Sequence, residues 1–344
     1  MADAGSAPIP VLEVERLRVS FPHRTPDDRH ATGPLRAVDD VSFTLYSGRT
    51  LGLIGESGCG KSVTAHALLR LVPSPGQQQA ERMTLHGSGA PVDLSTLDPA
   101  SEAMRSVRGG EVALVFQDAG ASLSPARTLG AQLRETIQAH RSLGRHEAER
   151  VALALLERVG FRDAARRMGD YPHQLSGGMG QRVAIALALC GEPRVLVADE
   201  PTTALDREVQ HEIVTLIRGL QADLGMAVLY ITHDLGLVED TCDDVAVMYL
   251  GRIVEMAPVR TLLTRPLHPY TIRLLESVPR LGQRRERLPT VKGTVPLPVD
   301  LPRACAFAPR CDVVEPGCHE FVPALIEVEP GHHVRCFLHS PELE

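Results

Sequence analysis

The sequence has no surplus of basic residues and no long apolar run. Its 344 residues carry 36 Lys and Arg against 43 Asp and Glu, a net charge of −7. Proteins whose main partner is nucleic acid need basic residues gathered on one face, so this balance argues against nucleic acid as a partner. The richest apolar stretch, VAIALALC at 183–190, falls well short of the roughly 18 to 20 residues that span a membrane.

The chain also opens without the features of a secretory signal. The segment MADAGSAPIP contains neither a positively charged region nor an apolar one. We therefore expect the chain to stay in the cytoplasm.

Lysine is nearly absent. Only Lys61 and Lys292 occur among the 36 basic residues, and all the others are arginine. A chain that uses arginine almost everywhere keeps a lysine where arginine would not serve. Lys61 is therefore the first candidate functional residue.

Alternating strand-like and helix-like segments predict an α/β fold. Strands are expected at 11–21, 37–46, 49–55, 111–116, 194–199, 227–232 and 244–250, and helices at 61–71, 128–140, 146–159, 179–190 and 207–222. Such alternation implies a mostly parallel sheet that is covered on both faces. After about residue 260 the composition shifts to Pro, Arg and Cys, which marks a separate C-terminal segment.

A glycine-rich segment between an apolar strand and a helix predicts a nucleotide site. Residues 55–62 read GESGCGKS, which matches the phosphate-loop pattern G-x-x-x-x-G-K-[ST] in the context it requires. Its glycines allow the backbone N–H groups to point at phosphate oxygens, where Lys61 would bridge the β and γ phosphates and Ser62 would ligate Mg²⁺. The predicted nucleotide-binding residues are Gly55, Glu56, Ser57, Gly58, Cys59, Gly60, Lys61 and Ser62.

Two carboxylates follow the expected strand at 194–199. Asp199 is placed to hold Mg²⁺ through water, and Glu200 could polarise an attacking water. Such a pair is a weak signal alone and becomes a strong one beside a phosphate loop.

Four further motifs resemble those of ABC-transporter ATP-binding subunits in order and spacing. They are LSGGMGQR at 175–182, ADEPTTALD at 198–206, Gln117 in VFQD and His233 in YITHD. The resemblance covers residues 11 to about 260. It implies a nucleotide-binding domain over 1–260 with antiparallel N-terminal strands, a mostly parallel core and a helical subdomain at about 118–190, followed by an extension over 261–344.

The resemblance also assigns roles to single residues. Glu200 would be the catalytic base of an ATPase, and Gln117 would sense Mg²⁺ and the attacking water. His233 would contact the γ-phosphate, and Asp206 would act across a subunit interface. Phe21 is the best candidate to stack on adenine, and a core phenylalanine is the alternative reading.

A second anion site is expected at the start of the signature helix. Ser176, Gly177 and Gly178 would place a hydroxyl and backbone N–H groups at its dipole-positive end. One chain with one phosphate loop has no evident use for two such sites. In the resembled family each ATP is sandwiched between the phosphate loop of one subunit and the LSGG segment of its partner.

The C-terminal segment indicates the type of transporter to which the chain belongs. PLHPYTIRLLESVP at 266–279 and the cysteines after it resemble the C-terminal extension of oligopeptide, dipeptide and nickel uptake ATPases. Met179 at the fifth signature position resembles the type whose partner ATPase is a different chain, so a heterodimer is favoured over a homodimer. The implied partners are two transmembrane permeases and an extracytoplasmic solute-binding protein, with the ATPase on the cytoplasmic face of the membrane. The implied solutes are short peptides, with nickel or glutathione as alternatives.

Four cysteines in the tail are candidate metal ligands. Cys305, Cys311, Cys318 and Cys336 follow the spacing C-x5-C-x6-C-x17-C. Disulfides are disfavoured in a reduced cytoplasm, so zinc or an iron–sulfur cluster gains weight. The lack of a C-x-x-C pair weakens zinc, and the resemblance favours a 4Fe-4S cluster. Unliganded thiols are the third alternative.

A function of another class is a soluble ABC ATPase that acts on DNA or ribosomes. Such proteins usually show tandem cassettes, coiled-coil insertions or a basic surface. This chain has one cassette and a net negative charge, which argues against that function.

Overall fold

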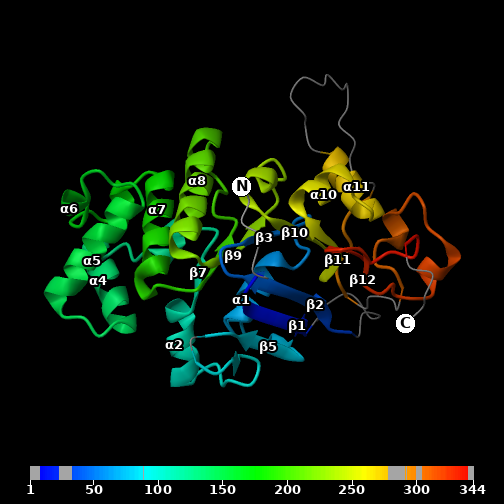
Figure 1. The fold of residues 1–344 in the computed structure, drawn as a ribbon, viewed down its shortest axis with the longest axis horizontal. Coiled ribbons are helices and arrows are strands. Elements are labelled where there is room, and N and C mark those ends of the chain that lie inside the picture. The colour runs from blue at the N-terminus through cyan, green and yellow to red at the C-terminus, as the bar shows by residue number, and fades with distance from the viewer. Residues whose placement is uncertain are drawn as a thin grey trace. The chain divides into compact units, whose positions relative to one another are not determined.

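The computed structural model describes residues 8–22, 33–87, 89–277, 291, 293–299 and 304–339. The chain, drawn as a ribbon in Figure 1, divides into two compact units, and each unit is assembled from several stretches of sequence. Unit 1 comprises Met1–Leu12, Leu45–Thr50 and Leu85–Ile231. Unit 2 comprises Glu13–Thr44, Leu51–Thr84 and Thr232–Glu344.

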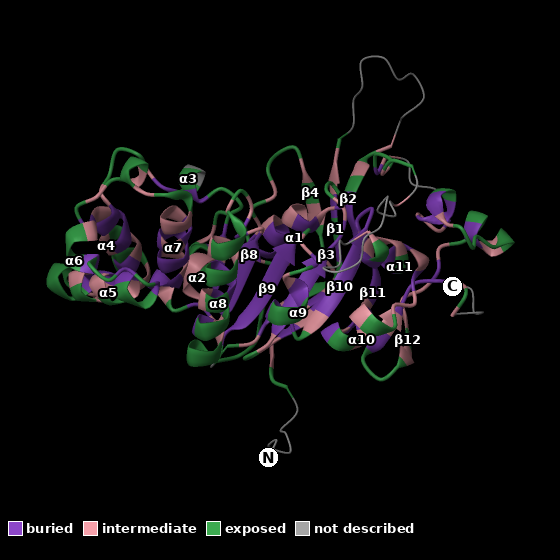
Figure 2. Ribbon diagram, turned by 90° about the horizontal axis from the view of Figure 1, so that it is seen from above, coloured by how far each residue is buried: buried purple, intermediate pink, exposed green. Residues whose placement is uncertain are grey.

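Parallel strands form the core of unit 1. Its strands β7 (Val112–Val115), β8 (Val195–Asp199) and β9 (Ala227–Thr232) pair in parallel in the order β9-β8-β7. Every residue of β8 and β9 is buried (Figure 2), as expected for an apolar run covered on both faces.

Helices make up most of the rest of unit 1. The group α4 (Leu129–His140), α5 (Arg145–Arg158), α6 (Ala164–Arg167) and α7 (Gly177–Ala188) packs together, with α8 (Arg207–Leu224) next to α7. In α4 the fully buried Leu129, Leu133 and Ile137 recur every four residues and form one apolar stripe. The helix begins where the Thr128 hydroxyl accepts a hydrogen bond from the Ala131 N–H.

The remaining elements of unit 1 are short: β6 (Val92–Asp93), α2 (Glu102–Gly110), α3 (Ala119–Ser122), η1 (Pro172–Gln174) and η2 (Leu189–Gly191).

A mixed sheet forms the larger part of unit 2. Strand β10 (Asp244–Tyr249) pairs in parallel with β3 (Thr50–Ile54) and antiparallel with β11 (Arg252–Pro258). Beyond β11 the sheet continues with β13 (His332–Val334) and β12 (Ile326–Glu329), both antiparallel. The last part of the chain therefore extends the sheet that carries the phosphate loop.

The other strands of unit 2 belong to a second sheet. Strands β2 (Leu35–Tyr46), β1 (Pro10–Phe21) and β5 (Arg82–Leu85) are neighbours, and β4 (Gln77–Gln79) pairs antiparallel with β1. The helices are α1 (Lys61–Leu68), α9 (Val238–Thr241), α10 (Val259–Thr264), α11 (Pro269–Glu276), η3 (Ala308–Arg310) and η4 (Pro316–His319).

One buried carboxylate joins the tail to the sheet. Glu255 of β11 is fully buried and accepts hydrogen bonds from the N–H groups of Leu267 (2.7 Å) and His268 (2.9 Å). Its Oε1 also lies 2.8 Å from Nε2 of His332 on β13. A buried carboxylate is stable only when it is hydrogen-bonded in this way. Glu255 therefore links both the start of α11 and the tail strand β13 to strand β11.

The expected secondary structure agrees well with these elements. The helix expected at 61–71 is shorter, because it ends at Leu68 and Arg70 adopts a left-handed conformation with φ of 54°. Several elements, among them α2, β5, β11, β12, β13 and α11, are additions that the sequence pattern did not indicate. Within the described ranges, no helix combines the length and the apolar character needed to cross a bilayer.

Candidate functional site

The phosphate loop of unit 2 runs from the end of β3 to the start of α1. Its turns need glycine at particular positions. Gly60 has φ of 110°, and a Cβ there would lie 2.1 Å from the carbonyl oxygen of Ala37. At Gly55 a Cβ would lie 2.2 Å from the carbonyl oxygen of Met248. Only glycine allows the backbone to approach its neighbours so closely.

Lys61 begins α1, and its side chain turns back into the loop. Its ammonium donates hydrogen bonds to the carbonyl oxygens of Gly55 (2.8 Å) and Glu56 (3.1 Å). The residue is only 5% exposed. The single positive side chain of the loop is thus fixed among backbone groups, while Ser62 is half-buried beside it in the first turn.

Glu56 of the same loop contacts two residues of the tail. Arg310 forms a two-pronged ion pair with its carboxylate, and the Tyr270 hydroxyl accepts its N–H. Hydrogen bonding to Glu56 raises the pKa of Arg310 above its usual range, and burial raises the pKa of Tyr270. Neither residue is recognisable as part of the nucleotide site from the sequence, although Tyr270 lies in the PLHPYT segment.

The two carboxylates of unit 1 lie at the end of β8. Asp199 is buried, and Glu200 follows it with φ of 47°, an unusual conformation for a residue other than glycine. The Glu200 N–H donates to the carbonyl of Ile231 on β9 over 2.9 Å. The end of the neighbouring strand thus holds the backbone in a form that is common at functional sites.

Gln117 and Glu200 are 83 positions apart and meet in unit 1. Oε2 of Glu200 accepts hydrogen bonds from Nε2 of Gln117 (3.1 Å) and from the hydroxyl of Thr203 (2.8 Å). Both of these donors are neutral groups, an amide and a hydroxyl, and they orient the carboxylate. This arrangement suits a group that accepts a proton.

The signature segment and Asp206 lie at the starts of adjacent helices. The Ser176 hydroxyl caps α7 by accepting the Met179 N–H, and Oδ1 of Asp206 caps α8 by accepting the Val209 N–H at 3.0 Å. A Cβ at Gly178 would lie 2.5 Å from Cγ1 of Val209, so a glycine there lets the two helices approach. Ser176, Gly177 and Asp206 are exposed.

The last two candidates belong to unit 2. His233 follows β9 and is exposed. Phe21 ends β1, is half-buried, and has its ring against Gly76. The structure thus places the phosphate loop, His233 and Phe21 in unit 2, and Gln117, Asp199, Glu200, Asp206 and the signature segment in unit 1. Their roles in binding and catalysis stay predictions.

Two protein families match the chain. The model for ABC transporters matches residues 38–203, and the model for the oligopeptide/dipeptide transporter C-terminal region matches residues 254–318. A protein of Brucella abortus (strain 2308) named "Putative peptide import ATP-binding protein" is 46% identical over 335 residues, which is 95% of this chain and 96% of the relative. The chain belongs to the ABC transporter family.

Other relatives of this ABC protein support the same family assignment. A protein of the same name from Brucella suis biovar 1 (strain 1330) is 45% identical over 327 residues, 95% of this chain and 94% of that one. A solved structure of cbiO1 from Clostridium perfringens, part of the ABC transporter complex cbiONQ, has a TM-score of 0.58 at 25% identity and covers 75% of this chain and 92% of its own.

The dimeric post-hydrolysis structure of the ATP-binding cassette MJ0796 with ADP and Pi has a TM-score of 0.59. Its identity is 23%, and it covers 72% of this chain and 99% of its own. This likeness shows the fold alone. The prediction of an α/β ABC ATPase cassette is confirmed, and so is the predicted family of the tail.

The four tail cysteines of this ABC ATPase come together in unit 2. The Cys305 N–H donates to the Cys318 carbonyl over 2.9 Å. Burial raises the pKa of Cys336 to about 11 and also raises those of Cys305 and Cys311. Negative charge on Cys305, Cys318 or Cys311 would raise the pKa of the Cys336 thiol. Burial therefore favours neutral thiols here.

The arrangement of these thiols does not form a ready metal site. All four are free, and among the residues the structure describes no group of three or more His, Cys, Asp or Glu is placed to hold a metal ion. Their donor chemistry suits zinc or an iron–sulfur cluster, but their arrangement does not. The structure thus gives no support to the predicted cluster.

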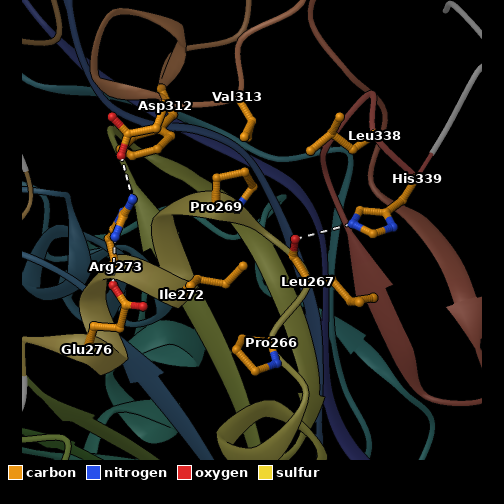
Figure 3. A pocket seen from close by; sticks show the side chains of 11 residues that line it. Pro266, Leu267, Pro269, Ile272, Arg273, Glu276, Asp312, Val313, Leu338 and His339 are labelled. Carbon is orange, nitrogen blue, oxygen red and sulfur yellow. Dashed lines mark hydrogen bonds and ion pairs between the residues drawn. The ribbon is translucent and has the colours of Figure 1, made fainter.

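A cavity of about 440 Å³ lies beside α11 in the tail (Figure 3). Its wall is mainly apolar and includes Leu267, Ile272 and Phe307. At its rim Arg273 pairs with Asp312 over 2.7 Å. This ion pair ties α11 to the loop that follows η3.

Proposed function

We propose that the chain is the ATP-hydrolysing subunit of a membrane importer for short peptides. Its membership of the ABC family supports ATP hydrolysis. The peptide assignment rests on the relatives named for peptide import at 46% identity and on the match of residues 254–318 to the oligopeptide/dipeptide transporter C-terminal region. The observation that carries the enzymatic part is the hydrogen-bonded pair of Gln117 and Glu200 at the end of β8.

The phosphate loop would bind the nucleotide. Its N–H groups and Lys61 meet the phosphate oxygens, and His233 contacts the γ-phosphate. Ser62, Gln117 and Asp199 supply the hydroxyl, amide and carboxylate oxygens that suit Mg²⁺. When bound, that ion neutralises charge on the phosphates. Phe21 would stack on the adenine.

Glu200 would act as the base. It accepts a proton from a water that Gln117 orients, and the water oxygen forms a bond to the γ-phosphorus. The bond from that phosphorus to the bridging oxygen of ADP breaks, and inorganic phosphate leaves. Glu200 suits this role because neutral donors orient its carboxylate.

A partner subunit would complete the site. Ser176, Gly177, Gly178 and Asp206 lie at helix starts and would meet the nucleotide of another chain. We propose that this partner is a different ATPase chain, and that both work at the cytoplasmic face of the membrane with two permeases and an extracytoplasmic solute-binding protein.

Reconstitution tests this function. The chain is assembled with the proposed permeases and partner ATPase in liposomes that contain ATP inside and have the solute-binding protein and the peptide outside. We expect ATP-dependent uptake of di- to pentapeptides and little ATPase activity from the isolated monomer. Uptake of nickel or glutathione but not peptides would reject the peptide assignment. Full activity of the monomer would reject the shared site.

We also propose that Cys305, Cys311, Cys318 and Cys336 bind a 4Fe-4S cluster, with zinc as the alternative. The proposal rests on the four cysteines of the tail and on the family resemblance of that segment, not on the arrangement of the thiols. Anaerobically purified protein should be brown and contain about four iron atoms per chain. A colourless preparation with zinc would favour the alternative, and four alkylatable thiols without metal would end both proposals.

A further inference from the structure

Glu56, the second residue of the phosphate loop, is held at three points. Its carboxylate accepts hydrogen bonds from Nη1 (2.7 Å) and Nη2 (3.0 Å) of Arg310. Its N–H donates to the hydroxyl of Tyr270 over 2.9 Å. Its carbonyl accepts one of the two hydrogen bonds that fix the ammonium of Lys61. The position of Glu56 therefore affects the loop backbone and the lysine together.

Arg310 is buried beside the phosphate loop. Its side chain is 5% exposed, and its guanidinium carbon lies 5.7 Å from the centre of the Tyr249 ring. Both of its terminal nitrogens are used by Glu56. A planar guanidinium paired in this two-pronged way fixes the direction of the carboxylate as well as its distance.

Arg310 and Tyr270 belong to one packed group in the tail. The ring of Phe307, three positions before Arg310, lies 5.4 Å from that of Tyr270, and the ring of Tyr249 lies 4.7 Å from that of Tyr270. The Arg310 N–H donates to the Phe307 carbonyl over 2.9 Å. The ion pair between Arg273 and Asp312 joins the same two segments on the outside (Figure 3).

The sequence explains how Tyr270 comes to lie there. The Glu255 carboxylate holds the N–H groups of Leu267 and His268. Nδ1 of His268 then caps α11 by accepting the Tyr270 N–H at 3.0 Å, and Pro269 suits the first helical position. The segment LHPY thus sets the first turn of α11 and the direction of the tyrosine.

The ion pair between Arg310 and Glu56 affects the charge of the phosphate loop. A loop that binds phosphates by N–H groups and a lysine is weakened by an uncompensated carboxylate among them. Arg310 neutralises Glu56 from inside the protein. Tyr270 meanwhile satisfies the N–H next to Gly55 and so restrains the entry to the loop.

We propose that Arg310 and Tyr270 are positioning residues of the nucleotide site, through which the C-terminal segment sets the affinity of the phosphate loop for MgATP. The proposal rests on the proposed binding of phosphates by this loop. It assigns to the tail a part in nucleotide binding that is separate from any metal its cysteines bind.

Calorimetric titration of MgATPγS into the full chain tests the proposal. Arg310→Met should weaken binding about tenfold, a size typical of coupling between sites. Arg310→Lys, which keeps the charge, should retain most of the affinity. Tyr270→Phe keeps the ring packing and removes the hydroxyl, and should weaken binding about threefold. Arg265→Met is the matched control, because its ion pair with Glu329 is exposed and lies in the same tail.

The decisive comparison is a double-mutant cycle. In a Glu56→Gln background, Arg310→Met should weaken binding less than about threefold, since the carboxylate it neutralises is gone. An equal loss in both backgrounds, or no loss in either, would overturn the proposal. Should Arg310→Met fail to fold, Tyr270→Phe decides, because Arg310→Lys is expected to bind almost normally: binding by Tyr270→Phe like that of Arg265→Met would overturn the proposal.

The proposed role of the loop is tested separately. Lys61→Ala should abolish binding of the same probe. If the unmodified chain fails to bind, or if Lys61→Ala binds equally well, the nucleotide site itself is wrong. A third result is that the unmodified chain and the tail variants bind the probe equally well, while Lys61→Ala does not bind it. This result would reject only the role of the tail.

Discussion

Glu200 of unit 1 and Glu56 of unit 2 are both carboxylates at nucleotide motifs, but they are held in different ways. Neutral donors, Gln117 and Thr203, contact Glu200, and both come from unit 1. A buried guanidinium 254 positions away pairs with both oxygens of Glu56. The first arrangement orients a carboxylate for proton transfer, and the second keeps one as a fixed anion.

This difference distinguishes a carboxylate that acts as a catalytic base from one that stabilises the phosphate loop. A base must change its protonation state during turnover, whereas a carboxylate held by a permanent positive partner stays an anion. A structural carboxylate gains from such a partner, because the charge stays constant. Substitutions at the two positions should therefore change different kinetic quantities.

The largest effect is expected for Glu200→Gln. The amide keeps the shape of the side chain but accepts no proton, so kcat should fall about a thousandfold while MgATP still binds. Phosphate release and nucleotide binding are measured on the same assembled transporter. A rate near that of the unmodified protein would show that another group is the base.

A third carboxylate, Glu255, is fully buried and extends the comparison. Glu255→Ala leaves the N–H groups of Leu267 and His268 without their acceptor and should lower the free energy of unfolding by about 3 to 5 kcal/mol. Chemical denaturation measures the loss. Glu329→Ala, which removes an exposed carboxylate of the same sheet, is the control and should cost less than about 1 kcal/mol. Equal losses would contradict the support assigned to Glu255.

The sequence predicted features that depend on neighbouring residues. The phosphate loop, the Ser176 cap and the strand that ends in Asp199 each follow from a short stretch of sequence, and the structure contains all three. The family resemblance also named Gln117 and Glu200, which the fold brings within 3.1 Å.

Features that depend on distant residues could not be predicted. The pair of Arg310 and Glu56 and the pairing of β13 with β11 join segments with no shared local pattern. Arg310 is one of 34 arginines by sequence, and only the fold shows that it is buried against the phosphate loop. The tail was expected as a separate segment because its composition changes, and composition does not reveal strand pairing.

A pH effect is expected at the start of α11, which carries Tyr270. Burial, with the nearby His339, lowers the pKa of His268 to about 3. The unfolded chain therefore binds more protons than the folded chain between the ordinary histidine pKa of about 6.5 and this value. Stability from this group is complete above pH 6.5 and is lost as the pH falls. Between pH 7 and pH 5 the loss should be about 2 kcal/mol.

His268→Asn tests this expectation. Asparagine also accepts the cap hydrogen bond but does not titrate. Denaturation of both proteins at pH 7, 6 and 5 should show a smaller loss for the variant. Identical pH profiles would show that His268 does not stay neutral on folding.

A pair of effects of opposite sign, the smaller at Gly180, is expected for two glycines of α7. A Cβ at Gly180 has nothing within 4 Å, so Gly180→Ala should stabilise unit 1 by about 0.5 to 1 kcal/mol. Gly178→Ala places a methyl group against Val209 and should destabilise it by about 1 to 3 kcal/mol. Thermal unfolding of the two variants should shift in opposite directions. Shifts in the same direction would contradict the close approach of α7 and α8.

The most direct test of the account is a side-by-side measurement of kcat and KM for MgATP in the assembled transporter. Glu200→Gln should lose kcat by about a thousandfold with KM little changed. Arg310→Met should raise KM about tenfold and lower kcat less than about threefold. This split would show that one carboxylate does the chemistry and the other supports the phosphate loop. A fall in kcat alone for both variants, or a rise in KM alone for both, would contradict the division of roles.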